Sequence, residues 1–259
     1  MASTTHKDYH SEEYDPVGFI QTYTDPANEK FRQYIMEHSI ALINKSFSSG
    51  LVKGNTLIDL SVAPLFGHLL VIANTFKEIT IVDSSETNRQ ETEKWLKQDS
   101  GAVDWSAWAK IVSSLTGKSE PWQKQEENVR RVVKRILPCD FTKDNPLDPV
   151  VLGPVDCVFT ALYLESISKD RDTYISNLRK AASLVKVGGY MVMFVPINMS
   201  YYVINNHKFF ILSIDEAFIQ KALVDLGFTL LNTDQCIDTL DTHLFDIEHM
   251  LYIVACKKK

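Results

Sequence analysis

The sequence is poor in glycine at the one turn where an α/β nucleotide-binding enzyme depends on it. The segment IDLSVAP, residues 58–64, indicates a buried strand that carries a carboxylate, Asp59, and turns into a helix. Ser61, Val62 and Ala63 stand where a ligand-cradling loop of this class carries glycines. Glycine permits positive φ and close backbone approach, whereas the β-branched Val62 resists a left-handed turn. The loop is therefore either a modified ligand site or one that has lost its ligand.

Basic clusters and long apolar runs are also missing. The 259 residues carry a net charge of −6, and the short run Lys257–Lys259 is typical of a solvated tail, so we expect no nucleic-acid partner. No window holds about 18 uninterrupted apolar residues, so we predict no membrane span. The polar start MASTTHKDYHSEEYDP lacks the apolar core of a secretory signal peptide.

Metal-binding and disulfide patterns are absent from the sequence. The seven histidines form no HExxH motif, and we interpret them as scattered surface or core residues. The four cysteines form no CxxC pair and no zinc pattern, so we expect reduced thiols, a cytoplasmic location and no metal. These cysteines are Cys139, Cys157, Cys236 and Cys256.

Length and composition favour one α/β domain over residues 1–259, because 45% of the residues are hydrophobic and no linker or internal repeat interrupts them. Residues 1–14 are expected to be flexible. The sequence has no heptads and no signature of an obligate interface, so we predict a monomer.

Strand-like and helix-like segments alternate along the chain, which predicts a mostly parallel sheet with right-handed crossovers. An additional hairpin is expected at 201–212, turning at Asn205-Asn206. The expected strands are 56–60, 78–83, 136–141, 155–162, 190–195, 228–236 and 249–256. The expected helices are 29–48, 64–75, one from Ser84 or Ser85 to about 98, 123–137, one capped by Asp170 that ends at Gly188-Gly189, and one that has a Ser213/Glu216 capping box and ends at Gly227.

Acidic residues near the strand ends are the candidate ligand-binding groups, because open α/β sheets bind ligands outside the carboxyl ends of their strands. Asp83 is the last residue of the second strand, where a carboxylate can accept hydrogen bonds from both hydroxyls of a ribose. It could instead be a helix N-cap or a solvent-facing acid. Asp140 could accept a hydrogen bond from an adenine amine, or be a turn acid before Thr142. Glu165 could pair with a cationic amine, or be an exposed acid near a helix start.

Several longer segments resemble a known enzyme family. These are LIDLSVAP, ITIVDSSETNRQETEKWLKQDSGAVDWS, RVVKRILPCDFTKDNPL, VDCVFTALYLESISKD and ASLVKVGGY. They resemble the small-molecule N-methyltransferases that act on nicotinamide, phenylethanolamine and indolethylamine, and the resemblance covers roughly residues 14–256. It implies a Rossmann-like S-adenosylmethionine-dependent fold, with a seven-stranded, mostly parallel sheet, a reversed last strand and the extra hairpin.

The resemblance also assigns roles to residues of this chain. Glu165 matches the acid placed near the substrate nitrogen, which implies a catalytic role. The implied substrate-binding residues are Phe19, Tyr23, Leu162 and Tyr202. The implied cofactor-binding residues are Asp59, Ser61, Asp83, Ser84, Asn88, Cys139, Asp140 and Phe141. The cofactor would be S-adenosyl-L-methionine.

Departures from the family pattern concern both halves of the site. The family loop has Gly-Ser-Gly before Pro64, and a tyrosine where this chain has Gly67. On the substrate side, Val195 replaces an aspartate, and Met199 and Ile211 replace serines. The implied substrate is a small amine or pyridine. Because these replacements make the pocket more apolar, they favour an arylalkylamine or another apolar amine over nicotinamide.

Two alternatives to methyl transfer stay open at the level of sequence. One is a non-catalytic or structural protein on the same fold, whose cofactor loop has drifted. The other is an unrelated Rossmann activity, such as a dehydrogenase. Binding of the cofactor separates the first alternative from an N-methyltransferase.

Overall fold

The structure is a computed structural model that describes residues 14–25, 28, 37–62, 67–117, 121–236 and 242–258. Its centre is a seven-stranded sheet in the order β3-β2-β1-β4-β5-β9-β8. The last strand runs antiparallel to both neighbours, whereas the other neighbouring pairs are parallel, which confirms the expected reversed last strand. The strands are β1 (Thr56–Ser61), β2 (Glu78–Asp83), β3 (Val133–Pro138), β4 (Val155–Ala161), β5 (Val185–Ile197), β8 (Phe228–Cys236) and β9 (His249–Lys257).

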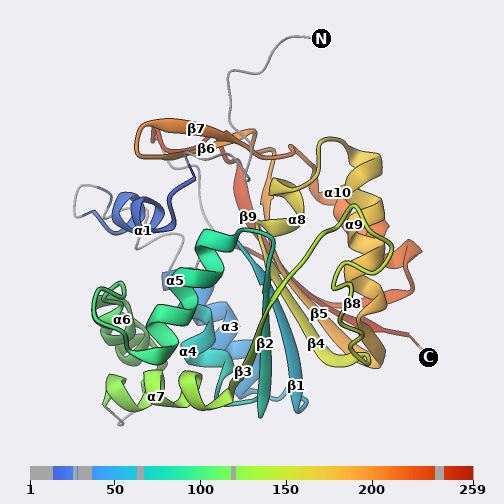
Figure 1. Cartoon of the computed structure of the whole chain (residues 1–259). Coiled ribbons are helices and arrows are strands. Elements are labelled where there is room, and N and C mark those ends of the chain that lie inside the picture. Colours follow the sequence, from blue (N-terminus) through green and yellow to red (C-terminus); the bar gives the residue numbers. More distant parts are fainter. Residues whose placement is uncertain are drawn as a thin grey trace.

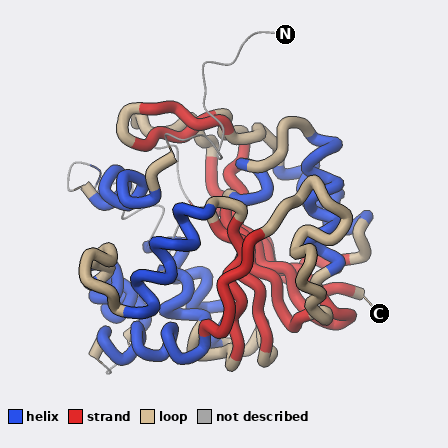
Figure 2. The backbone as a smooth tube through the Cα atoms, in the orientation of Figure 1, coloured by secondary structure: helices blue, strands red, loops and turns tan. Residues whose placement is uncertain are grey.

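Helices cover both faces of this sheet (Figures 1 and 2). One face carries α3 (His38–Ser48), α4 (Gly67–Ile72), α5 (Glu86–Lys97), α6 (Ser106–Thr116) and α7 (Trp122–Val132). The other carries α8 (Tyr163–Ser166), α9 (Arg171–Ser183) and α10 (Glu216–Asp225). Burial on both faces explains the continuous apolar strands, and every residue of β4 is buried. Among the helices described, none has the length and apolarity needed to cross a bilayer.

The topology reverses between β1 and β4. From β1 the chain moves outward through β2 to β3, and then returns to place β4 on the other side of β1. The side chains that follow these strands therefore meet at one edge of the sheet. Helix α1 (Pro16–Thr24) and the hairpin of β6 (Tyr201–Ile204) and β7 (His207–Phe210) lie beyond this edge. In Figure 1 the hairpin is at the top, and α1 is at the left below it.

Several local predictions are confirmed. Ser85 caps α5 by accepting a hydrogen bond from the Asn88 amide at 3.3 Å. Asp170 caps α9 in the same way. The hairpin turns at Asn205 and Asn206, whose φ angles of 47° and 65° are the left-handed values that a tight hairpin turn requires.

The helix predicted over 123–137 is wrong at its C-terminal end. It ends at Val132, and residues 133–138 form β3 alongside β2. The edge of β2 offers backbone partners that outweigh the helix propensity of the charged segment. Cys139, Asp140 and Phe141 therefore follow the third strand and do not belong to it.

Two further boundaries differ from expectation. Helix α9 ends before Leu184, and Gly188 and Gly189 lie inside β5. A Cβ at Gly189 would approach the Asp156 carbonyl oxygen to 2.8 Å, so the sheet requires this glycine. The cap of α10 is Asp215, which accepts from the Phe218 amide at 2.8 Å, and not Ser213.

Other expectations fall partly or wholly outside the described residues. They are the flexible segment up to residue 13, the helix before residue 37 and the helix start at Pro64. Tyr14, which was expected to be flexible, is buried and packs edge-on against Phe209 of the hairpin.

Asp156 fastens the start of β1 to β4. Its carboxylate accepts hydrogen bonds from the amides of Asn55 and Thr56 at 2.8 and 2.9 Å, and it pairs with Lys186. Burial alone would raise the pKa of Asp156, but these partners outweigh burial and hold it at about 2. Since the folded pKa lies below the ordinary 3.8, Asp156 stabilises the fold above that pH.

We predict that Asp156→Asn lowers the free energy of unfolding by about 2 kcal/mol at pH 7. The difference from the wild type should shrink as the pH falls from 3.8 toward 2, because the wild-type carboxylate becomes protonated there. Urea unfolding at several pH values measures this. Asp148→Asn, which breaks an exposed pair with Lys143, is the control and should change stability by less than about 0.5 kcal/mol. Equal losses in both variants would contradict the assignment.

Candidate active site

Polar side chains from three adjacent strands form a row at the carboxyl edge of the sheet. Asp59 and Ser61 come from β1, Asp83 closes β2, and Cys139 follows β3. Because β3, β2 and β1 are neighbours in that order, the predicted cofactor residues come together in space although they span about 80 positions of sequence.

Asp83 and Asn88 form a buried carboxylate–amide pair. The Asn88 side-chain nitrogen donates to one Asp83 oxygen at 2.8 Å, and the Ser85 amide donates to the other at 2.7 Å. Asp83 is 4% exposed and the helix cap is Ser85, so Asp83 is neither a solvent-facing acid nor the N-cap. Tyr14 lies nearby: burial raises the pKa of its phenol well above the ordinary value, and Tyr202 and Asp83 add to the shift.

Tyr163 links the ends of β2 and β3. Its hydroxyl donates to the Ser84 hydroxyl at 2.9 Å and lies 3.0 Å from the Cys139 sulfur. Burial raises the pKa of the Cys139 thiol to about 12, so this cysteine is a neutral packing group at physiological pH. Phe141 packs edge-on against the Tyr163 ring at 5.9 Å.

Asp140 is exposed and forms a local turn. One of its oxygens accepts hydrogen bonds from the amide and the hydroxyl of Thr142, at 2.9 and 2.6 Å. These bonds hold the pKa of Asp140 below its ordinary value. These contacts match the interpretation of Asp140 as a turn acid. Its second carboxylate oxygen is the atom that could accept a hydrogen bond from an adenine amine.

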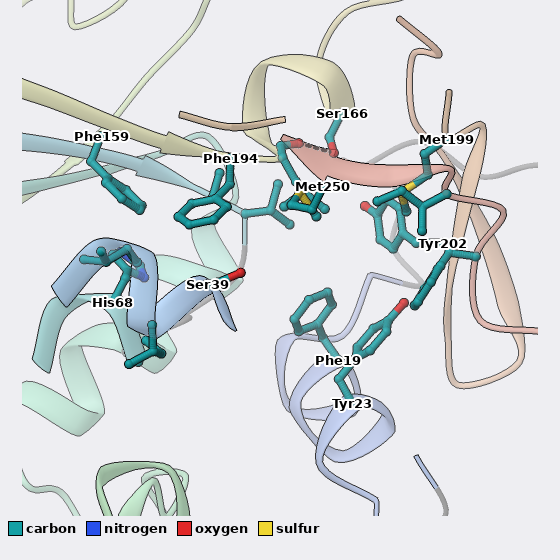
Figure 3. Close-up of a pocket in the computed structure, with 18 of the residues that line it drawn as sticks. Phe19, Tyr23, Ser39, His68, Phe159, Ser166, Phe194, Met199, Tyr202 and Met250 are labelled. Atoms are coloured by element: carbon teal, nitrogen blue, oxygen red, sulfur yellow. Dashed lines mark hydrogen bonds between the residues drawn. The ribbon is translucent and has the colours of Figure 1, made fainter. Parts of the chain in front are cut away.

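An almost wholly apolar cavity adjoins the β1–β4 switch point (Figure 3). All four predicted substrate-binding residues line it: Phe19, Tyr23, Leu162 and Tyr202. Met199, one of the predicted pocket changes, also lines it, whereas Val195 and Ile211 are buried elsewhere in the core. Sequence reasoning missed a further set of lining residues, whose only signal was hydrophobicity: Ile40, Ile43, Trp105, Trp108, Phe159, Phe194, Phe245, Ile247 and Met250.

Helix α1 closes one end of the cavity and is held by the hairpin. Asp15 caps α1 through the Val17 amide at 3.0 Å, and its other oxygen accepts from the Asn205 side chain at 3.0 Å. The Phe19 and Tyr23 rings pack 4.8 Å apart on the inner side of the helix (Figure 3). The Asp15-Pro16 start of α1 therefore sets where these aromatic rings meet the cavity.

A histidine that the sequence did not single out lies at the opposite end. The His68 Nε2 atom is 2.9 Å from one oxygen of Asp59, and the Ser61 hydroxyl donates to the other at 2.6 Å. All three residues are buried, and the His68 ring stacks on Phe159 at 4.7 Å with a 7° interplanar angle. In the described residues no group of three or more histidine, cysteine or acidic side chains has a metal-binding arrangement.

Glu165 does not reach the cavity, although a role beside the substrate nitrogen was predicted for it. It is 1% exposed and accepts a hydrogen bond from the Tyr174 hydroxyl at 2.8 Å, under α9. Its neighbour Ser166 lines the cavity instead and donates to the Leu162 carbonyl. Burial raises the pKa of Glu165 to about 7, against the opposing effect of Tyr174.

We predict that the stability of the protein falls as the pH rises from 4.5 to about 7, because folding favours the protonated form of Glu165 in this window. Glu165→Gln removes the titration and should make the protein about 2–3 kcal/mol more stable than the wild type at pH 8. Urea unfolding between pH 5 and about 8 measures this. Glu127→Gln, at an exposed position, should leave the pH profile unchanged. A wild-type profile without this fall would contradict the buried acid.

The chain is similar in sequence to a known protein family. The model of the NNMT/PNMT/TEMT family matches residues 2–258. Indolethylamine N-methyltransferase of Oryctolagus cuniculus is 35% identical over 227 residues, which cover 86% of this chain and 85% of that protein. Nicotinamide N-methyltransferase of Homo sapiens is also 35% identical over 227 residues, covering 87% and 86%.

Solved structures support the fold. An S-adenosylmethionine-dependent methyltransferase from Clostridium acetobutylicum superposes with a TM-score of 0.57 over 93% of this chain and 98% of that one. The sequence identity of 13% means that this likeness concerns the fold alone. The fold is the Rossmann-like methyltransferase fold, and the chain belongs to the NNMT/PNMT/TEMT family.

Proposed function

We propose that this protein is an S-adenosylmethionine-dependent N-methyltransferase that methylates the nitrogen of a small apolar amine or pyridine. The observation that carries this proposal is the meeting of two features at one edge of the sheet. A row of strand-end polar groups, from Asp59 to Cys139, adjoins an apolar cavity lined by Phe19, Tyr23 and Tyr202. The first suits a nucleoside cofactor and the second a small apolar acceptor.

The donor set fits S-adenosylmethionine. Asp83, buried and oriented by Asn88, would accept the ribose hydroxyls. Cys139, Asp140 and Phe141 would border the adenine. Ser84 would lie between the ribose site and the adenine site. Asp59 and Ser61 belong to the β1 turn, on the side of the site nearest the cavity.

The residues of the chain have a limited chemical task. S-adenosylmethionine supplies an already activated methyl group, so alignment of the reacting atoms and exclusion of water account for most of the catalysis. The apolar wall excludes water, and the Tyr23 and Tyr202 rings can face the positive charge that develops on the substrate nitrogen. Since Glu165 lies outside the cavity, we assign it a supporting place under α9 and no contact with the substrate.

The sequence has no heptads and no signature of an obligate interface, so the proposed enzyme would act as a monomer. All four cysteines are free thiols, which suits a reducing compartment such as the cytoplasm.

Calorimetric titration with S-adenosylhomocysteine, the demethylated cofactor product, tests the cofactor half of the proposal. Micromolar binding is expected. Asp83→Asn should weaken it by about 10- to 100-fold, because one charge-assisted hydrogen bond contributes about 1.5–3 kcal/mol. Asp225→Asn, at an exposed position on α10 beside the opposite edge of the sheet from β3, should not. A folded wild-type protein that binds no ligand at about 1 mM would overturn the proposal in favour of a non-catalytic protein on this fold.

Substrate preference tests the other half. Met199→Ser introduces a hydroxyl into the apolar wall, so kcat/KM for arylalkylamines should fall by about tenfold while that for nicotinamide rises. Rates with a panel of amines and pyridines measure this. Val187→Ser, at an exposed position, is the control. A wild type that prefers nicotinamide, with Met199→Ser unchanged, would contradict the apolar-acceptor assignment.

A further inference from the structure

His68 differs chemically from the rest of the cavity wall. Among the described residues that line the cavity, it alone carries an imidazole, amine or carboxylate group. The other side chains there with polar atoms are the hydroxyl-bearing Tyr23, Ser39, Ser166 and Tyr202 and the indoles of Trp105 and Trp108. A group that can carry charge is costly on an apolar wall unless it is paired or binds a ligand.

The Asp59 carboxylate fixes one nitrogen of the His68 ring. Because a carboxylate only accepts hydrogen bonds, His68 Nε2 must donate to the Asp59 oxygen 2.9 Å away. The Ser61 hydroxyl and the stacked Phe159 ring further restrict the arrangement. The remaining ring nitrogen, Nδ1, makes no hydrogen bond in the described part of the chain. It is also not one of the fully buried polar atoms that lack a partner, so a ligand can reach it. The ring is therefore fixed, and Nδ1 can donate to an anionic ligand when the imidazole carries its second proton.

The backbone of the β1 turn cannot supply an equivalent donor at Val62. The Val62 amide donates to the Ala161 carbonyl at 3.0 Å, which extends the β1–β4 pairing by one residue. A glycine-rich loop turns away from the sheet and directs its amides at the ligand, whereas this amide is already used. A side chain can take over the role of the Val62 amide if the ligand carries an anionic group here.

The strand order indicates which part of the cofactor reaches His68. With the ribose at Asp83 on β2 and the adenine beside Cys139 after β3, the rest of the cofactor extends across β1 toward β4. That remaining part is the amino-acid end, which bears a carboxylate. His68, at the start of α4 after β1, lies on this side of the site.

We propose that His68, as an imidazolium that donates from both ring nitrogens, binds the α-carboxylate of the cofactor's amino-acid end through Nδ1, and that Asp59, which accepts from Nε2, is the positioning residue that orients it. The inference rests on the proposed function. It assigns to His68 the anion-binding task that glycine amides would otherwise perform, so the IDLSVAP turn is a modified cofactor loop.

The experiment compares two ligands that differ only in this carboxylate: S-adenosylmethionine and decarboxylated S-adenosylmethionine, titrated by calorimetry. The wild type should bind the first roughly 10- to 100-fold more tightly, the range expected for one charge-assisted hydrogen bond. His68→Phe keeps the stacking on Phe159 but has no donor. In this variant the ratio of the two affinities should fall to about one, with the decarboxylated ligand bound as in the wild type.

His68→Gln is the matched second variant. Its amide nitrogen can take the place of Nε2 and keep the bond to Asp59, while nothing replaces Nδ1. The ratio should therefore fall in this variant too, without loss of thermal stability. A ratio that stays at the wild-type value in folded His68→Gln would overturn the inference. A wild type that binds neither ligand would instead remove the proposed function, so the two failures are distinguishable.

Discussion

The parallel pairing of β1 with β2 on one side and with β4 on the other is the constraint on which the site depends. It brings the ends of strands separated by a hundred residues to one edge, and it creates the point where the strand order reverses. Asp156 reinforces this pairing at the opposite end of the strands by accepting hydrogen bonds from the amides of Asn55 and Thr56, at the start of β1. Cofactor-type and substrate-type residues meet because this central strand has neighbours from both halves of the chain.

The β1 turn shows how a substitution of glycines can be compensated locally. Ser61 is not an inert replacement, because its hydroxyl donates to Asp59 at 2.6 Å. Val62 is accommodated because the backbone continues its pairing with Ala161 instead of turning through a left-handed conformation. At the end of β1 a carboxylate, a hydroxyl and an imidazole are therefore joined by hydrogen bonds.

Glu165 occupies a position that the resemblance assigned to the substrate pocket, but its side chain bonds to Tyr174 and does not line the cavity. It directly precedes a cavity-lining residue, yet on a one-turn helix consecutive side chains point in different directions. Its carboxyl is enclosed with Tyr174 in the core, where burial favours the neutral form. The cavity then has no acid among its described lining residues, and its preference for an acceptor rests on shape and apolar contact.

The sequence by itself determined the strands, their alternation with helices, the hairpin turn at Asn205-Asn206 and the caps at Ser85 and Asp170, because these depend on local hydrophobic pattern and turn chemistry. By resemblance it also pointed to three residues that line the cavity, Phe19, Tyr23 and Tyr202. Only the tertiary structure decided that β3 begins at Val133, that Glu165 lies outside the cavity and that His68 lies on Asp59. Those outcomes depend on contacts between distant segments: the open edge of β2, the packing of α9, and a ring stacked on a strand about 90 residues away. No local pattern encodes such contacts.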